Sequence, residues 1–294
     1  MSDRLPIDDA LEPLRAALRA GPSAVLEAPP GAGKTTRVPL ALLSESWVGA
    51  GRIVMLEPRR LAARAAAERM AESLGERPGE TVGHRIRGEA VVSRATRIEV
   101  CTEGVLTRRL QDDPSLDGVA AVIFDETHER SIHSDLGLAL CVEAQDALRP
   151  DLRLLAMSAT LDAAPLARLM GDAPVIRSEG RAYPVETRWR DAPLPRDASR
   201  EAAAGEAALE ALWDADGDVL VFLPGAAEIR RCAAALAPRL PPGVDLRVLH
   251  GAEPADRQRA ALAPCAPGRR KVVLSTAVAE TSLTVAGVRA VEIG

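Results

Sequence analysis

The segment 23–36, which reads SAVLEAPPGAGKTT, constrains the fold more than any other part of the chain. Its apolar start favours a strand, its prolines and glycines favour a tight loop, and apolar residues resume from Val38 as in a helix. Strand, glycine-rich loop and helix in this order predict a phosphate-binding loop, because loop glycines let backbone N–H groups surround an anion. The strict pattern has glycine where this chain has Ala28, so the interpretation depends on the GxGKT core and its flanks.

This loop predicts a nucleotide site in which each group has its own task. Lys34 is expected to reach the β- and γ-phosphates, and Thr35 to place its hydroxyl on Mg²⁺. The following helix directs its positive N-terminal end at the same anion. The residues expected to bind the nucleotide are Gly31, Ala32, Gly33, Lys34, Thr35 and Thr36.

Length and composition predict a protein of two domains that is not embedded in a membrane. The chain has 294 residues, of which 47% are hydrophobic and 27% charged, as is typical of globular proteins. No apolar run has the length of a membrane span, and the N-terminus lacks a signal-peptide pattern. The four cysteines are scattered without a CxxC pair, which favours reduced thiols and a cytoplasmic location.

The charge distribution argues against a protein that holds nucleic acid by bulk positive charge, since the net charge is −5. Residues 52–109 differ, with 12 arginines against 8 acidic residues, and this local excess suits a phosphate backbone, although a solvated surface would also explain it. Aromatic residues make up 2% of the chain, so a platform that stacks successive bases is not expected.

Polar residues that are capable of chemistry follow one apolar segment after another in the first half of the chain. In an open parallel α/β sheet, ligands bind at the edge where the strands have their carboxyl ends. The regularity therefore predicts an α/β fold with one site built from several strand ends. The expected strands after the first are Arg52–Leu56, Arg97–Cys101, Val119–Phe124 and Leu152–Met157, followed by Glu57, Thr102, Asp125 and Ser158.

A change of composition divides the chain. Ser178–Arg200 is rich in proline and charge, with one possible strand at Val185–Trp189, and predicts a linker. Alternating helix and strand patterns then resume and continue to Val288–Ile293. The predicted organisation is a first domain over residues 1–178, a linker with the entry to the second domain over 179–200, and a second domain over 201–294.

Asp125 and Glu126 follow the most apolar predicted strand and suit metal-dependent phosphoryl chemistry. An aspartate there can bind Mg²⁺, and the adjacent glutamate can orient and deprotonate an attacking water. His128 could instead be a zinc ligand, although no partner at metal spacing is close in sequence. The hydroxyls of Ser158 and Thr160 could simply cap the following helix.

The ordered motifs of the chain resemble those of the DEAH-box branch of superfamily 2 helicases. The similarity runs from about Ser23 to Gly294. The matching segments are APPGAGKT (28–35), EPRRLAAR (57–64), TEG (102–104), DETHER (125–130), SAT (158–160), FLPG (222–225), LHG (249–251) and STAVAETSLTV (275–285).

This resemblance implies an α/β protein with two RecA-like P-loop NTPase domains and mainly parallel sheets. The second domain is expected to be incomplete, because the arginine-rich motif VI of the family does not follow before Gly294. The resemblance further implies ATP, or another nucleoside triphosphate, and Mg²⁺ as cofactors. Lys34, Asp125, Glu126 and His128 would be catalytic, with Thr35 and Asp125 as the metal ligands.

The resemblance also implies coupling and nucleic-acid residues. Ser158 and Thr160, with His128, would link the nucleotide state to domain movement. A track for single-stranded RNA or DNA would cross both domains. Its residues would be Arg59, Arg60, Thr102, Glu103, Gly104, His250, Gly251, Ser275, Thr276 and Thr281.

The function expected from these motifs is an NTP-dependent helicase or translocase, present here as a fragment deficient in hydrolysis. The alternative is a nucleotide- and nucleic-acid-binding module without turnover of its own. A small-molecule kinase is a third interpretation, against which the SAT and EPRR segments and the second α/β half argue. The choice between RNA and DNA, the protein partners and the oligomeric state stay open.

Overall fold

The computed structural model describes residues 4–159, 163–180, 184–195, 198–280 and 283–293. The chain divides into two compact units, Met1–Tyr183 and Pro184–Gly294. The boundary lies within the expected linker, residues 179–200. The expected sites Thr160 and Thr281 lie outside the described residues.

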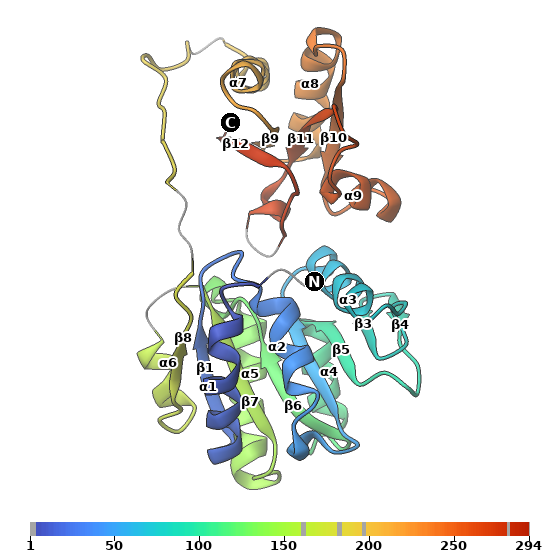
Figure 1. Cartoon of the computed structure of the whole chain (residues 1–294), viewed down its shortest axis with the longest axis vertical. Helices are drawn as coiled ribbons and strands as arrows, with labels where there is room; N and C mark the ends of the chain where they lie inside the picture. The colour runs from blue at the N-terminus through green and yellow to red at the C-terminus, as the bar shows by residue number, and fades with distance from the viewer. Residues whose placement is uncertain (1–3, 160–162, 181–183, 196–197, 281–282, 294) are drawn as a thin grey trace. The chain divides into compact units, whose positions relative to one another are not determined.

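The first unit contains one eight-stranded sheet (Figure 1). Its strand order is β4-β3-β5-β2-β6-β7-β1-β8, and all neighbours are parallel except β3 and β4. The strands are β1 (Ser23–Glu27), β2 (Arg52–Glu57), β3 (Val82–Ile86), β4 (Glu89–Val91), β5 (Ile98–Thr102), β6 (Val119–Phe124), β7 (Arg153–Ser158) and β8 (Val175–Arg177).

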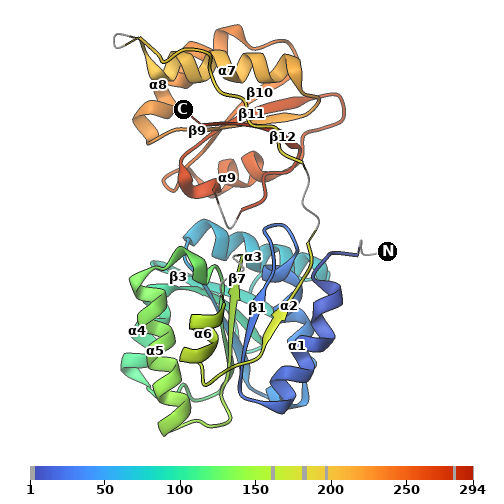
Figure 2. The same ribbon diagram turned by 90° about the vertical axis from the view of Figure 1, so that its left-hand side faces the viewer.

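Helices cover both faces of this sheet (Figure 2). Apolar side chains of α1, α2 and α3 pack on one face, and those of α4, α5 and α6 on the other. The alternation of side chains along each strand explains the two cores: Ile53 and Met55 belong to the first, and Val54 and Leu56 to the second. The helices are α1 (Asp8–Ala20), α2 (Lys34–Leu42), α3 (Arg60–Ser73), α4 (Glu103–Asp112), α5 (Ile132–Ala147) and α6 (Ala164–Leu169).

The second unit has a four-stranded parallel sheet in the order β10-β11-β9-β12. Side chains of α7 and α8 pack with alternate residues of β9 and β11 in its apolar core. The elements are α7 (Arg200–Asp214), β9 (Asp218–Phe222), α8 (Ala226–Leu236), β10 (Val244–Leu249), α9 (Ala255–Leu262), β11 (Arg270–Ser275) and β12 (Val288–Ile293).

The expected strand at Val185–Trp189 is wrong. Residues 184–190 have no regular structure, and the Val185 and Trp189 side chains are exposed. These apolar side chains resemble those of a strand, but the segment does not hydrogen-bond to a neighbouring strand and so forms no β-structure. Sequence reasoning also missed the short strands β3, β4 and β8, of which β4 and β8 have three residues each.

An ion-pair cluster ties β3 and β4 to α3. Glu89 accepts hydrogen bonds from Arg64 at 2.5 Å and pairs with His84 Nε2 at 2.8 Å. These partners lower the pKa of Glu89 from 4.5 to about 2. A carboxyl group with a depressed folded-state pKa stabilises the fold above its unfolded-state pKa, and this stabilisation is lost as the pH falls towards the folded-state value.

We therefore expect Glu89→Gln to lower the free energy of unfolding at pH 7, with a difference from wild type that shrinks as the pH falls from 4.5 to about 2. Urea unfolding at a series of pH values measures this difference. The control is Glu80→Gln, which neutralises an exposed carboxylate in the same region. A Glu89→Gln deficit that stayed constant down to pH 2 would contradict the prediction.

Candidate functional site

The glycine-rich loop lies between β1 and α2 and has the backbone that its glycines permit. Gly31 and Gly33 have φ values of 76° and 95°, in the left-handed region that favours glycine. At Gly33 a Cβ would also lie 2.6 Å from Leu5 Cδ1. The first hydrogen bond into α2 runs from the Arg37 amide to the Gly33 carbonyl, at 3.0 Å. The amides of the first turn of α2 are therefore at the open, positive end of the helix.

Lys34 and Thr35 contact the two acidic residues that follow β6, about ninety positions further along the chain. Lys34 Nζ lies 2.8 Å from Glu126 Oε1, and Thr35 Oγ1 donates to Asp125 Oδ2 at 2.6 Å. The Glu126 amide donates to Asp125 Oδ1 at 2.8 Å, which orients that carboxylate. Lys34, Asp125 and Glu126 are all buried. The structure thus brings four predicted residues into one polar cluster.

Burial and neighbouring charge shift the pKa values in this cluster. Burial alone would lower the pKa of Lys34, but the carboxylates of Asp125 and Glu126 outweigh it, and the pKa is raised. Burial, and then the charge of Asp125, raise the pKa of Glu126. A carboxylate with a raised pKa binds a proton more readily than an ordinary one, which suits a general base.

Glu57 is a buried member of the site that sequence reasoning did not assign. It ends β2, next to β6, and its side chain is completely buried. Burial, then the charges of Asp125 and Glu126, raise the pKa of Glu57 well above its ordinary value. An acidic residue at the end of an apolar strand was the available signal, but only the strand order shows that it faces Asp125.

His128 joins Glu126 to the segment after β7. Its Nε2 lies 3.2 Å from Glu126 Oε2, and its Nδ1 accepts a hydrogen bond from the Ala159 amide at 3.2 Å. Thr127 Oγ1 donates to the Met157 carbonyl at 3.0 Å. Ser158 itself is buried at the end of β7, and its carbonyl accepts from the Ala28 amide. Of the predicted coupling residues, His128 therefore contacts the carboxylate cluster, and Ser158 contacts the beginning of the phosphate-binding loop.

The turn that carries these residues has an unusual backbone. The single 3₁₀ turn Thr127–Glu129, labelled η2, is flanked by Glu126 and Arg130, which both have φ of 52°. Residues other than glycine rarely adopt this left-handed conformation, and each costs about 1–3 kcal/mol. The surrounding contacts must therefore hold the turn in this form.

The predicted nucleic-acid residues of the first unit lie at the carboxyl ends of β2 and β5, which are adjacent in the sheet. Arg60 and Gly104 are exposed, at the beginnings of α3 and α4. Arg59 NH2 lies 3.4 Å from Glu129 Oε1, and Ser131 Oγ donates to Glu103 Oε2 at 2.9 Å. The segment after the Asp-Glu pair thus contacts both predicted nucleic-acid motifs of this unit.

In the second unit the predicted residues lie at the carboxyl ends of the neighbouring strands β10 and β11. Ser275 Oγ and the Thr276 amide both donate to the Leu249 carbonyl, at 3.1 and 3.3 Å. His250 Nε2 lies 3.2 Å from Glu253 Oε1, and Gly251 next to it is exposed. The structure brings these residues together along one edge of this sheet.

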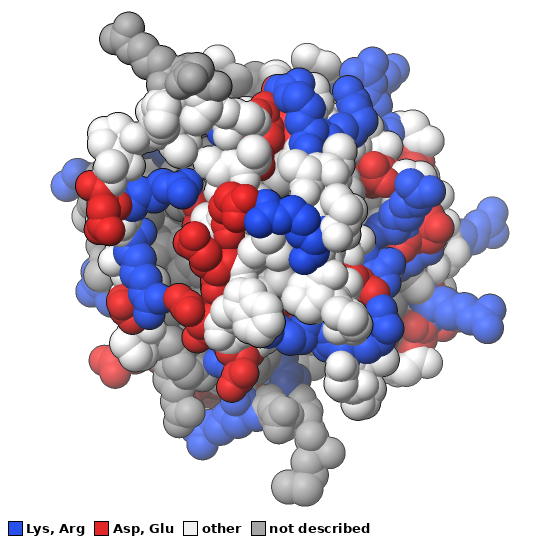
Figure 3. Space-filling view, turned by 90° about the horizontal axis from the view of Figure 1, so that it is seen from above, with Lys and Arg blue, Asp and Glu red and all other residues white. Residues whose placement is uncertain are grey.

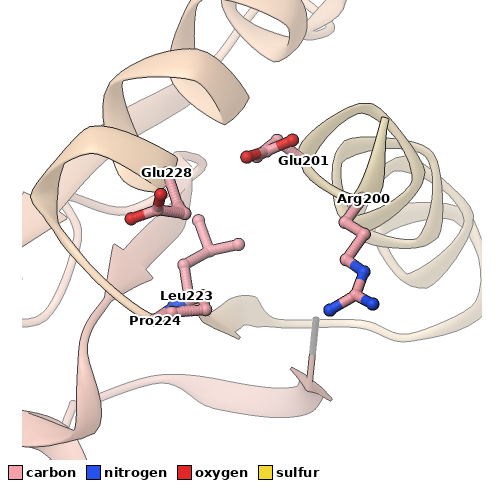
Figure 4. A pocket seen from close by; sticks show the side chains of 5 residues that line it. All are labelled: Arg200, Glu201, Leu223, Pro224 and Glu228. Carbon is pink, nitrogen blue, oxygen red and sulfur yellow. The ribbon is translucent and has the colours of Figure 1, made fainter. Parts of the chain in front are cut away.

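A separate pocket of about 250 Å³ opens at the end of β9 (Figure 4). It contains none of the predicted site residues. Arg231 pairs with Glu201 at 2.7 Å and with Glu228 at 2.6 Å, so the acidic side chains of the pocket already have a cationic partner. The lining residues are Arg200, Glu201, Leu223, Pro224 and Glu228.

Charges on the face shown in Figure 3 are mixed in sign. Basic and acidic side chains lie close to one another there, without a large area of one sign. Pairs such as Arg239 with Glu206 and Arg231 with Glu201 illustrate this pattern in the second unit. Mixed charges of this kind give this face no extended positive field that would attract a polyanion.

The described residues contain no helix that is both long and apolar enough to cross a membrane. They also contain no group of three or more His, Cys, Asp or Glu side chains that could hold a metal ion. Nothing in this part of the chain therefore supports the alternative of His128 as a zinc ligand.

The loop, the buried Asp-Glu pair and the parallel sheet define a RecA-like P-loop fold. Two family models match the chain: DEAD/DEAH box helicase over residues 11–169, and helicase conserved C-terminal domain over residues 205–293. The chain belongs to the DEAD/DEAH box helicase family.

Individual relatives agree with this assignment. The chain is 50% identical over 287 residues to the ATP-dependent RNA helicase HrpB of Escherichia coli, covering 98% of this chain and 35% of that protein. It is 34% identical to the ATP-dependent RNA helicase HrpA homolog of Haemophilus influenzae, covering 88% of this chain and 20% of the relative. A crystal structure of the E. coli DEAH/RHA helicase HrpB matches with a TM-score of 0.92 at 49% identity, over 98% of this chain and 36% of that one. The chain thus spans about a third or less of the length of these relatives.

Proposed function

We propose that the chain forms the nucleotide- and RNA-binding part of an ATP-dependent RNA helicase. The observation that carries this proposal is the contact of Lys34 and Thr35 with Asp125 and Glu126, at 2.8 and 2.6 Å. The relatives named above are ATP-dependent RNA helicases, which favours RNA over DNA as the nucleic acid. We assign residues 1–178 and 201–294 to the two RecA-like domains and 179–200 to their connection.

The donor set fits Mg²⁺–ATP. The loop offers an open helix end and a buried ammonium group for phosphates, whereas Thr35 and Asp125 offer the oxygen ligands that Mg²⁺ prefers. Thr35 and Asp125 would hold the metal, and Gly31 to Thr36 the phosphates. Bound Mg²⁺ would supply charge neutralisation at the phosphates.

The protein's own groups then have separable roles in hydrolysis. When nucleotide binds, the Lys34 ammonium group would leave the Glu126 carboxylate and pair with the phosphates. The carboxylate and the phosphates are both anions, and they compete for the same ammonium group. Glu126, released from Lys34, would accept a proton from the attacking water. His128 would hold the Glu126 carboxylate in its orientation. Because His128 also contacts the Ala159 amide, a movement of this carboxylate would be transmitted to the Ala159 backbone.

The nucleic-acid track would run over Arg59, Arg60 and the start of α4 in the first domain, and over His250, Gly251 and the end of β11 in the second. The supporting observation is that each set lies at the carboxyl edge of adjacent strands. The cysteines in the described residues are free, and three of the four are buried, which is consistent with our proposal of a cytoplasmic location.

The test is ATP hydrolysis with and without single-stranded RNA, in a form of the protein that includes this chain. We expect RNA to raise the hydrolysis rate. Nucleotide and RNA binding without any turnover would favour the binding-module alternative. Transfer of phosphate to a small acceptor, without a response to RNA, would favour a kinase.

RNA binding is expected to ignore base sequence and to weaken steeply with salt, because arginines and backbone amides would contact phosphates. For about four neutralised phosphates on a single strand, log K should fall with log[salt] at a slope of about −3. Fluorescence anisotropy with homopolymers of equal length measures both properties. An affinity insensitive to salt, or a strong preference for one homopolymer, would contradict this prediction.

A further inference from the structure

The ion pair between Arg59 and Glu129 joins two segments to which we assign different tasks. Arg59 belongs to the proposed nucleic-acid track, whereas Glu129 ends the turn that follows Asp125 and Glu126. Arg59 NH2 and Glu129 Oε1 are 3.4 Å apart, with side chains 24% and 19% exposed. The pair is therefore partly open to solvent, and its guanidinium can be reached by a ligand.

A carboxylate and a backbone phosphate offer a guanidinium the same interaction. Both are anions with several acceptor oxygens, and arginine pairs well with either. The optimal charge-assisted hydrogen bond has an N···O distance of about 2.7–2.9 Å, which is shorter than the 3.4 Å seen here. Glu129 thus occupies the position on Arg59 that a phosphate could take. A phosphate could approach the guanidinium more closely than Glu129 does.

Replacement of Glu129 by a phosphate on Arg59 would act on the turn that follows the catalytic carboxylates. Glu126, in contact with Lys34 and His128, immediately precedes the turn η2, of which Glu129 is the last residue. The left-handed residues Glu126 and Arg130 bound this turn, so a change at one of its ends alters a backbone held away from its preferred conformation. Ser131, two residues after Glu129, contacts Glu103 of the other predicted nucleic-acid motif in this unit.

We propose that Glu129 acts as an internal substitute for a nucleic-acid phosphate on Arg59. A backbone phosphate displaces Glu129 when single-stranded RNA binds, so the ion pair sets how tightly the first domain holds RNA. Glu129 is a positioning residue in this scheme and touches neither nucleotide nor RNA. The inference rests on the proposed function, because it requires RNA to contact Arg59.

The experiment is a double-mutant cycle on RNA affinity, read by anisotropy of a fluorescent 12-nucleotide oligouridylate. Glu129→Gln removes the competing charge and keeps the shape, and we expect it to tighten RNA binding about threefold to fivefold, the upper part of the range for an exposed ion pair. Arg59→Ala should weaken binding several-fold. In the Arg59→Ala background, Glu129→Gln should have no further effect, because the contested guanidinium is gone.

Arg60→Ala supplies the matched background. It removes a neighbouring exposed arginine of the same proposed track, yet the gain from Glu129→Gln should persist in it. Asp135→Asn, which neutralises an acid that pairs with Arg130, should leave RNA affinity unchanged. If Glu129→Gln folds poorly by circular dichroism, Glu129→Ala replaces it with the same expected gain.

The outcomes separate this inference from the proposed function. If the wild-type protein does not bind single-stranded RNA, both fail. If it binds RNA but Glu129→Gln leaves affinity unchanged, weakens it, or tightens it equally in the Arg59→Ala background, the inference alone is overturned. A general effect of lost negative charge would be additive in both arginine backgrounds, whereas competition for Arg59 is not.

Discussion

Lys34→Ala is expected to reduce ATP hydrolysis by about 10²–10³-fold in any form of the protein that turns over ATP, the usual effect of removing one donor that stabilises charge in a transition state. The physical reason is that Lys34 is the buried cation that now pairs with Glu126, and the nucleotide phosphates would replace Glu126 as its partner. Steady-state phosphate release at saturating RNA and nucleotide measures the loss.

Arg37→Ala is the control for this variant. Arg37 lies on the same helix, next to the phosphate-binding loop, and forms an ion pair with Asp8 at 3.9 Å. We expect it to retain most of the activity. Turnover of Lys34→Ala within a few-fold of wild type, with the fold intact by circular dichroism, would refute the assignment of Lys34 to the phosphates.

Glu126→Gln is expected to stop turnover while nucleotide binding continues. The amide keeps an oxygen that can accept from Lys34, so the loop should retain its arrangement. It cannot accept a proton from water, and loss of a general base typically costs about 10²–10⁴-fold in rate. Calorimetric titration with nucleotide and a hydrolysis assay measure the two properties separately.

The matched control is Glu143→Gln, the same chemical change at an exposed position on α5. Its turnover and affinity should equal those of wild type. Wild-type turnover in Glu126→Gln would show that another group accepts the proton. A parallel loss of nucleotide affinity would instead mean that the carboxylate holds the loop together.

Much of this site was predictable because its residues follow strands, and strand ends are visible as breaks in apolar runs. The segment at 119–126 shows this clearly: VAAVIF predicts β6, and DE follows it directly. Val185–Trp189 shows the limit of the same reasoning. Its alternating apolar residues resemble a strand, yet a strand forms only where a neighbour supplies hydrogen bonds, and residues 184–190 have no regular structure.

The sequence by itself determined the α/β class, the phosphate-binding loop and the order of the motifs, because these depend on local periodicity and on residue types at short spacing. Only the tertiary structure decided which strand ends are neighbours. The order β5-β2-β6-β7-β1 places Glu57 beside Asp125 and brings Arg59 to Glu129. Strand order is set by long-range packing of the two apolar faces of the sheet, and local sequence patterns do not show which strands become neighbours.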